Sequence, residues 1–217
     1  MKQSDIIRPF VKPLKLLQNL IEEYQCTGII IGGLAVSLIS RPRFTADIDV
    51  MVLMPIEQIH NLINSAINYG FITRIPDAEN FACKNRVLLL QHQESGINID
   101  ISFGLLPFEI EAVKHSKEYK IEDFSIYLPS PEDLIIFKAI AHRPKDLLDI
   151  QAIVEFNPEL HKKRIKKNVQ EFAKLLDMPE LWTDIKTYIE QIRVTCNKAE
   201  KGSKDEHRRK KESGKDR

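Results

Sequence analysis

Asp47 and Asp49 stand two positions apart in the 217-residue chain, within a segment, Asp47–Val52, whose other residues are apolar. Side chains on a strand alternate between its two faces, so both carboxylates project from one face and point at one region. Like charges at such a distance repel unless a cation lies between them, and divalent metals prefer carboxylate oxygens. The pair therefore indicates a divalent metal site.

A third acid, Asp100, lies in the segment Asn98–Phe103, which alternates polar and apolar residues. This alternation predicts a half-buried strand. If that strand lies beside the one that carries Asp47 and Asp49, three carboxylates converge on one or two metal ions. Taken alone, Asp100 is equally well explained as an exposed acid on a strand.

Gly32 and Gly33 follow the apolar run Ile29–Ile31, which predicts a strand buried on both faces. A turn without side chains lets a phosphate approach the backbone, and the helix expected next directs its free amides at an anion. Phosphoryl transfer from a nucleotide requires such an anion site beside a metal. By itself, a glycine pair before a helix is as often an ordinary turn.

Two cations are candidates for contact with phosphate. Arg43 lies in the connection that leads to Asp47, and Lys138 lies among apolar residues on a helix for which Ser130 is the expected N-cap and Pro131 the first residue. A lysine in that setting either extends its amine to solvent or meets an anion. We expect Lys138 to meet an anion.

The C-terminal third of the chain is rich in charge. Asp146 and Asp149 are three residues apart and share a helix face, where they are either solvated surface charges or face the cleft. In His161–Lys167, six of seven residues are basic or histidine. This segment predicts a positive patch, which suits either nucleic-acid phosphates or simple solvation.

Overall composition excludes several classes of protein. Lys plus Arg total 32 against 31 for Asp plus Glu, so the net charge of +1 gives no general attraction to nucleic acid or membranes. Three widely spaced cysteines exclude a disulfide framework and indicate a reducing compartment. No apolar segment approaches the length of a membrane span or signal sequence, so we expect a cytoplasmic protein without a membrane partner.

Hydrophobic spacing predicts alternating helices and strands. Helices are expected at Lys12–Tyr24, after Gly33, at Pro55–Tyr69, Pro107–His115 and Asp133–His142, from Pro144 onward, and twice within Pro158–Cys196. Strands are expected at Ile29–Ile31, from Asp47, and at Phe71–Ile75, Phe81–His92, Asn98–Phe103 and Phe124–Leu128. We therefore divide the chain into a core (1–128), a C-terminal helical segment packed on it (129–196) and a flexible charged tail (197–217).

Together these residues resemble a known family. Gly32-Gly33, Arg43-x-Thr45-x-Asp47-Ile48-Asp49 and Asp100 in Asn-Ile-Asp-Ile are similar to motifs of the DNA polymerase β superfamily of nucleotidyltransferases. Lys138 in Ile-Ile-Phe-Lys-Ala, with Arg143-Pro-Lys-Asp146-x-x-Asp149, resembles later motifs of the AbiEii-like branch, the toxins of type IV toxin–antitoxin systems. The resemblance implies an α/β (α+β) minimal nucleotidyltransferase fold, a mixed twisted sheet flanked by helices.

The resemblance also implies an activity, the metal-dependent transfer of a nucleoside monophosphate from an NTP to an acceptor hydroxyl. The implied catalytic residues are Asp47, Asp49, Asp100, Lys138 and Asp146. The first three would hold Mg²⁺ or Mn²⁺. The implied nucleotide-binding residues are Gly32, Gly33, Arg43, Thr45 and Lys138.

The acceptor stays open at this point. Gly33 stands where many members of the superfamily have serine, so backbone amides must replace that hydroxyl. Lincosamide and aminoglycoside nucleotidyltransferases share the glycine pair and the two acids, so an antibiotic is an alternative to tRNA, other nucleic acid or protein. An antitoxin is a further expected partner. A non-catalytic nucleotide-binding module and a structural interaction protein are the alternatives from other classes.

Overall fold

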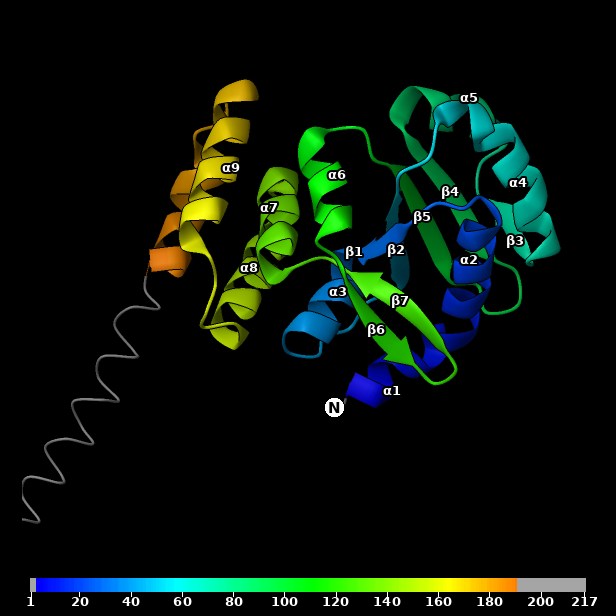
Figure 1. The fold of residues 1–217 in the computed structure, drawn as a ribbon, viewed down its shortest axis with the longest axis horizontal. Coiled ribbons are helices and arrows are strands. Elements are labelled where there is room, and N and C mark those ends of the chain that lie inside the picture. The colour runs from blue at the N-terminus through cyan, green and yellow to red at the C-terminus, as the bar shows by residue number, and fades with distance from the viewer. Residues whose placement is uncertain (1–2, 191–217) are drawn as a thin grey trace, which may run out of the picture.

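The computed structural model describes residues 3–190, so the predicted tail, 197–217, lies outside the described residues (Figure 1). Five strands form a sheet of order β1-β2-β5-β4-β3, and β6 and β7 form a separate hairpin. The strands are β1 Gly28–Ile31, β2 Asp47–Val52, β3 Phe71–Thr73, β4 Val87–His92, β5 Asn98–Phe103, β6 Lys117–Ile121 and β7 Phe124–Leu128. Neighbours β2 and β5 are parallel, and the other pairs are antiparallel.

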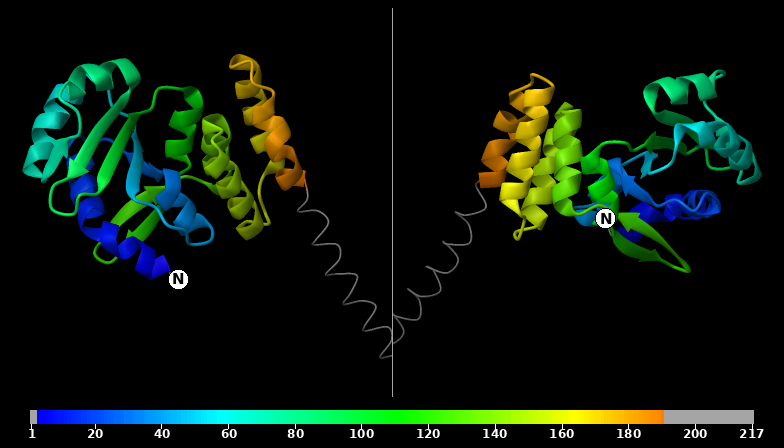
Figure 2. Two further views of the ribbon diagram at one scale, coloured as in Figure 1. Left: turned by 180° about the vertical axis from the view of Figure 1, so that it is seen from behind. Right: turned by 45° about the horizontal axis from the view of Figure 1, so that its top comes forward.

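Helices surround the sheet. They are α1 Gln3–Ile7, α2 Val11–Glu23, α3 Gly32–Ile39, α4 Ile59–Asn68, α5 Ala78–Asn85, α6 Pro107–Lys114, α7 Pro131–Ala141, α8 Pro144–Phe156 and α9 Lys162–Leu175, with 3-10 turns η1 Arg8–Phe10 and η2 Ile56–Gln58. Residues 180–190 are also helical. Helices α4 and α5 lie at one end of the molecule, and α7, α8 and α9 pack side by side at the other (Figure 2). Helix α3 contacts both α7 and α8, which connects the two parts.

The five-stranded sheet has one apolar and one polar face. On β2 and β5 the side chains of Ile48, Val50, Ile99 and Ile101 are at most 1% exposed and belong to the same core as the apolar side of α2. The alternate residues of the same strands are Asp47, Asp49, Met51, Asn98, Asp100 and Ser102, and all of them except the buried Met51 are half-buried. The alternation therefore directs the acids away from the core, as predicted.

The prediction of a single strand over Phe81–His92 is wrong for the first half of that segment. Helix α5 begins at Ala78 and ends at Asn85, its C-cap Arg86 has a left-handed φ of 55°, and β4 starts at Val87. Ala78 and Ala82, four residues apart, are buried on one side of α5, whereas Phe81 is 37% exposed. A helix face made only of alanines carries little hydrophobic signal, so the strong apolar run of β4 dominated the prediction.

The remaining differences are smaller. Strand β6 was not predicted because its charged residues leave only Ile121 buried. The N-terminal α1 and η1 were not predicted either. The Ser130 cap is confirmed, since its hydroxyl accepts a hydrogen bond from the backbone N–H of Asp133. None of the helices described is long and apolar enough to cross a membrane.

Candidate active site

The three acids lie on one face of the sheet. In the parallel pairing of β2 with β5, Asp49 lies opposite Asp100, and Asp47 lies opposite Asn98. Register partners on neighbouring strands project to the same side, as do residues two apart on one strand. The structure therefore brings Asp47, Asp49 and Asp100 together on the polar face, as the sequence predicted.

The electrostatics of this face favour a bound cation. Burial raises the pKa of Asp49 above its usual range, and the negative charge of Asp47 adds to the shift, although Lys138 and Arg143 oppose it. Burial likewise raises the pKa of Asp100, and Asp49 and Asp47 raise it further. These carboxylates are therefore costly to ionise without a partner, and a cation among them would remove that cost.

The residues fit a divalent metal in their chemistry. Three carboxylates supply the oxygen ligands that Mg²⁺ and Mn²⁺ prefer. Across residues 3–190, however, no three His, Cys, Asp or Glu side chains are gathered closely enough to hold a metal ion. Two of these acids have other partners, since Arg74 forms an ion pair with Asp100, and Asn98 Nδ2 donates to Asp47 Oδ1 at 3.2 Å.

The glycine turn lies directly against the acids. Gly32 has a φ of +67°, and a Cβ atom there would lie 1.8 Å from Asp49 Oδ2. The backbone of Gly33 lies close enough to Asp49 to oppose the rise in the pKa of that carboxyl. A Cβ at Gly33 would lie 2.7 Å from Thr45 Oγ1 and 2.9 Å from Arg43 Nη2. Close approach to neighbouring side chains therefore explains both glycines.

Lys138 meets anions, as predicted. Its Nζ lies 2.9 Å from Asp146 Oδ1 and 2.9 Å from Asp149 Oδ2. Lys138 is 4% exposed, Asp146 0% and Asp149 3%. The alternative of solvated surface acids on α8 is therefore wrong, because both carboxylates turn inward toward α7.

Two arginines extend this cluster. Arg43 Nη2 donates to Asp149 Oδ2 at 2.8 Å, and its Nε lies 2.7 Å from Oδ1 in an ion pair outside hydrogen-bond geometry. Arg143 Nε donates to Asp146 Oδ2 at 2.6 Å. Burial tends to raise the pKa of Asp146, but hydrogen bonds from Arg143 and Lys138 outweigh it and hold that pKa below its usual range. Three cations share two carboxylates, so the cluster has surplus positive charge.

Sequence reasoning missed Arg74. It lies just after β3, where its backbone N–H donates to Leu89 O at 3.0 Å, and its side chain reaches across to Asp100. The residue was included in the predicted strand Phe71–Ile75. Its relation to Asp100 depends on the order and register of three strands, which local spacing does not specify.

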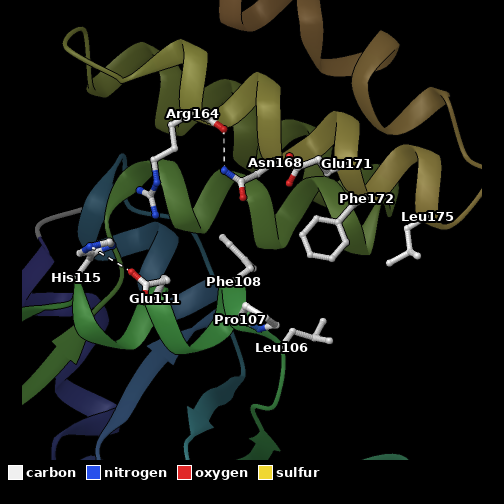
Figure 3. Close-up of a pocket in the computed structure, with 10 residues that line it drawn as sticks. All are labelled: Leu106, Pro107, Phe108, Glu111, His115, Arg164, Asn168, Glu171, Phe172 and Leu175. Carbon is white, nitrogen blue, oxygen red and sulfur yellow. Dashed lines mark hydrogen bonds and ion pairs between the residues drawn. The ribbon is translucent and has the colours of Figure 1, made fainter.

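A pocket of about 480 Å³ lies elsewhere, between α6 and α9 (Figure 3). Phe108 and Phe172 both line it and pack edge to face, with ring centroids 5.8 Å apart. Its lining consists of Leu106, Pro107, Phe108, Glu111, His115, Arg164, Asn168, Glu171, Phe172 and Leu175. None of the predicted site residues is among them, so this pocket is not the predicted active site.

The mixed sheet, the glycine turn and the acids beside it define the protein's class as a nucleotidyltransferase. Residues 16–212 match the sequence model of the family described as "Nucleotidyl transferase AbiEii toxin, Type IV TA system". Because the match spans most of the 217 residues, the chain belongs to the AbiEii family of nucleotidyltransferase toxins. The predicted family and enzyme class are confirmed.

Solved structures share the fold at low sequence identity. An antigenic nucleotidyltransferase-like protein from Paracoccidioides brasiliensis is 15% identical over 84% of this chain and 93% of its own, with a TM-score of 0.50. The antibiotic-resistance factor ANT(2'')-Ia is 16% identical over 82% of this chain and 97% of its own, with a TM-score of 0.52. A structure of ANT(2'')-Ia in complex with adenylyl-2''-tobramycin is 16% identical over 76% of this chain and 98% of its own, with a TM-score of 0.52. These likenesses confirm the predicted fold class, and no curated protein matches the chain.

Proposed function

We propose that this protein uses a divalent metal to transfer a nucleoside monophosphate from an NTP to an acceptor hydroxyl, with release of pyrophosphate. The observation that carries the proposal is the placement of Asp47, Asp49 and Asp100 on one sheet face, beside the Gly32-Gly33 turn. The raised pKa values of Asp49 and Asp100 support a cation there. Family membership supports the reaction type.

The three carboxylates would hold Mg²⁺ or Mn²⁺. When bound, such an ion neutralises triphosphate charge and makes a hydroxyl easier to deprotonate. The acceptor oxygen forms a bond to the α-phosphorus, the bond to the bridging oxygen of the β-phosphate breaks, and pyrophosphate leaves with that electron pair. Asp100 would take the hydroxyl proton.

The cationic cluster acts on the leaving group. Arg43 and Lys138 supply positive charge where negative charge accumulates on pyrophosphate, and their fixed pairing avoids reorganisation during the reaction. Asp146 positions Lys138 through the 2.9 Å contact. Thr45 lies beside Gly33 and completes the nucleotide-binding side of the site together with the backbone of the glycine turn.

We also propose that the acceptor is an RNA such as tRNA, and that the protein acts as a toxin with an antitoxin partner. Helix α9 exposes Lys163, Lys166, Lys167 and Lys174. Lys166 also lies 5.8 Å from the ring centroid of Trp182. A row of exposed lysines suits a phosphate backbone. The toxin role rests on the family description.

The test supplies each α-labelled NTP with Mg²⁺ and whole-cell extract, and measures label in the RNA, protein and small-molecule fractions. We expect incorporation into RNA with the wild-type protein. Asp49→Asn and Asp100→Asn should each lower incorporation by about 10² to 10³-fold without loss of folding. Asp123→Asn is the matched control, because Asp123 is an exposed acid paired with Lys15 in the β6–β7 hairpin.

The outcomes separate the alternatives. Label in the small-molecule fraction would replace the RNA acceptor with an antibiotic-like one while preserving the reaction. Binding of NTP without any labelled product would favour a non-catalytic module. Full activity in the Asp49→Asn protein would refute the assignment of the metal site. Cells that produce wild-type protein should stop growing, and those that produce Asp49→Asn should not.

A further inference from the structure

Arg74 is aligned with the predicted metal ligands across the sheet. Its backbone N–H donates to Leu89 O, Leu89 lies opposite Asp100 in β4–β5, and Asp100 lies opposite Asp49 in β5–β2. Residues that lie opposite one another on neighbouring strands project from the same face of the sheet. Arg74 therefore belongs to the face that carries the acids, although it is 26 residues from Asp100 in the sequence.

The contacts of Arg74 are few for a partly buried guanidinium. Its Nη2 forms the ion pair with Asp100 Oδ1. Its Nε is buried and has no hydrogen-bond partner among the described residues. Arg43 Nε likewise lacks a hydrogen bond, but two nitrogens of Arg43 lie against both oxygens of Asp149. The side chain of Arg74 is 25% exposed and that of Asp100 35%, so the pair is open to ligands and ions.

A guanidinium and a metal ion are alternatives at this carboxylate. Asp100 Oδ1, the oxygen that faces Arg74, would not be free to bind a metal ion while this ion pair is intact. A divalent ion placed there would also be repelled by the adjacent positive charge. Removal of Arg74, in turn, would leave Asp100 without its ion-pair partner beside Asp49 and Asp47, which is the condition that favours metal binding.

We propose that Arg74 is an internal counter-ion that holds Asp100 in the metal-free enzyme, competes with the divalent ion for that carboxylate, and so sets the affinity for metal. The inference rests on the proposed function, because it takes Asp47, Asp49 and Asp100 as the metal ligands. Arg74 is a positioning residue in this account. It acts through Asp100, and it must move away before Asp100 can bind metal or accept a proton.

The test measures Mn²⁺ binding to the nucleotide-free protein, by the electron paramagnetic resonance signal of free Mn²⁺. Arg74→Gln should bind Mn²⁺ roughly tenfold more tightly than wild type, because the competing charge is gone. Arg74→Lys keeps the charge and should stay within about threefold of wild type. Lys84→Gln, which removes an exposed cation from α5 nearby in the sequence, should leave the affinity unchanged.

If the ion pair between Arg74 and Asp100 has only a structural role, the Mn²⁺ measurement gives a different result. In that case Arg74→Gln lowers the melting temperature and leaves Mn²⁺ affinity equal to wild type or weaker, which would overturn the inference. Loss of the proposed function is recognised separately. If Asp49→Asn binds Mn²⁺ as well as wild type does, the acids are not the metal site, and both proposals fail. If Asp49→Asn weakens binding and Arg74→Gln does not tighten it, only the role of Arg74 fails.

Discussion

Two charged regions meet at this active site, and they are built in opposite ways. The cluster around Lys138 is buried, and each of its carboxylates contacts two cations. The sheet face with Asp47, Asp49 and Asp100 is half-buried and has surplus negative charge. The cluster satisfies its charges within the protein, whereas the sheet face leaves charge that an added ion can satisfy.

We infer from this difference that the sheet face is where an added ion would bind, whereas the cluster holds Arg43 and Lys138 in place. Burial makes an unpaired charge expensive, so a buried cluster persists only when its partners are complete. Raised pKa values in a half-open face are typical of functional sites. Arg43 belongs to the cluster and also contacts the glycine turn, so it connects the two regions.

The largest expected effect comes from breaking the buried cluster. Lys138→Met leaves Asp146 and Asp149 with one cation each and removes the amine that lies between them. Removing one partner from a buried ion pair costs about 3–5 kcal/mol. We therefore expect a lower free energy of unfolding by that amount, measured by urea denaturation, together with loss of nucleotide transfer.

The control for this variant is Lys145→Met, which changes an exposed lysine on α8 next to Asp146. Exposed substitutions usually stay within about 0.5 kcal/mol. If Lys138→Met unfolds at the same urea concentration as Lys145→Met, the cluster is not the scaffold described above.

A smaller effect is expected at the point where the two regions touch. Gly32→Ala forces an L-residue into a φ of +67° and places its Cβ 1.8 Å from Asp49 Oδ2. The backbone strain alone costs of order 1–3 kcal/mol. The clash also displaces Asp49, so nucleotide transfer should fall further than the loss of stability explains, as measured by thermal melting and labelled-NTP incorporation.

The Gly96→Ala variant distinguishes the effect of backbone strain from the effect of the clash with Asp49. Gly96 has nearly the same φ, +69°, and nothing within 4 Å of an added Cβ. It should show the strain without the clash, and it should retain nucleotide transfer. Equal activity in both alanine variants would mean that Asp49 can move aside without consequence.

Local sequence patterns predicted most of this site because its chemistry is concentrated in short segments. The two-residue spacing of Asp47 and Asp49 fixes their common face, and the polar alternation around Asp100 does the same for its strand. The prediction for Lys138 started from local context, since a lysine enclosed by apolar neighbours either extends its amine to solvent or meets an anion. The distribution of apolar residues was enough for most strands and helices, and the mixed sheet followed from the family resemblance.

The missed features depend on contacts between distant segments. Arg74 becomes significant only through the order β5-β4-β3 and the register that carries its side chain to Asp100. The N-terminal half of the Phe81–His92 prediction failed for a related reason, because Ala78 and Ala82 gain their burial from tertiary packing rather than from hydrophobicity. Roles for the site residues remain predictions until the variants are measured.

The smallest expected effect is a change in the melting temperature of Asp49→Asn, and its direction is what the measurement tests. The pKa of Asp49 is raised in the folded protein, mainly by burial and also by Asp47, so its ionised form is less favourable there than in the unfolded chain. That cost is absent below the unfolded pKa and fully present above the folded one. Without metal, Asp49→Asn should therefore melt slightly higher than wild type at pH 7, by roughly 2 °C, and the gain should vanish on acidification.

Asp123→Asn should respond in the opposite direction. The hydrogen bond from Lys15 lowers the pKa of Asp123, so its ionised form favours folding at neutral pH and loses that advantage as the pH falls. This variant should melt at or slightly below wild type at pH 7. Added Mn²⁺ distinguishes the two sites further, because it should raise the melting temperature of wild type and of Asp123→Asn but not that of Asp49→Asn. If Asp49→Asn melts lower than wild type in the absence of metal, the carboxylate is already satisfied within the protein, and the contrast between a complete cluster and an incomplete face does not hold.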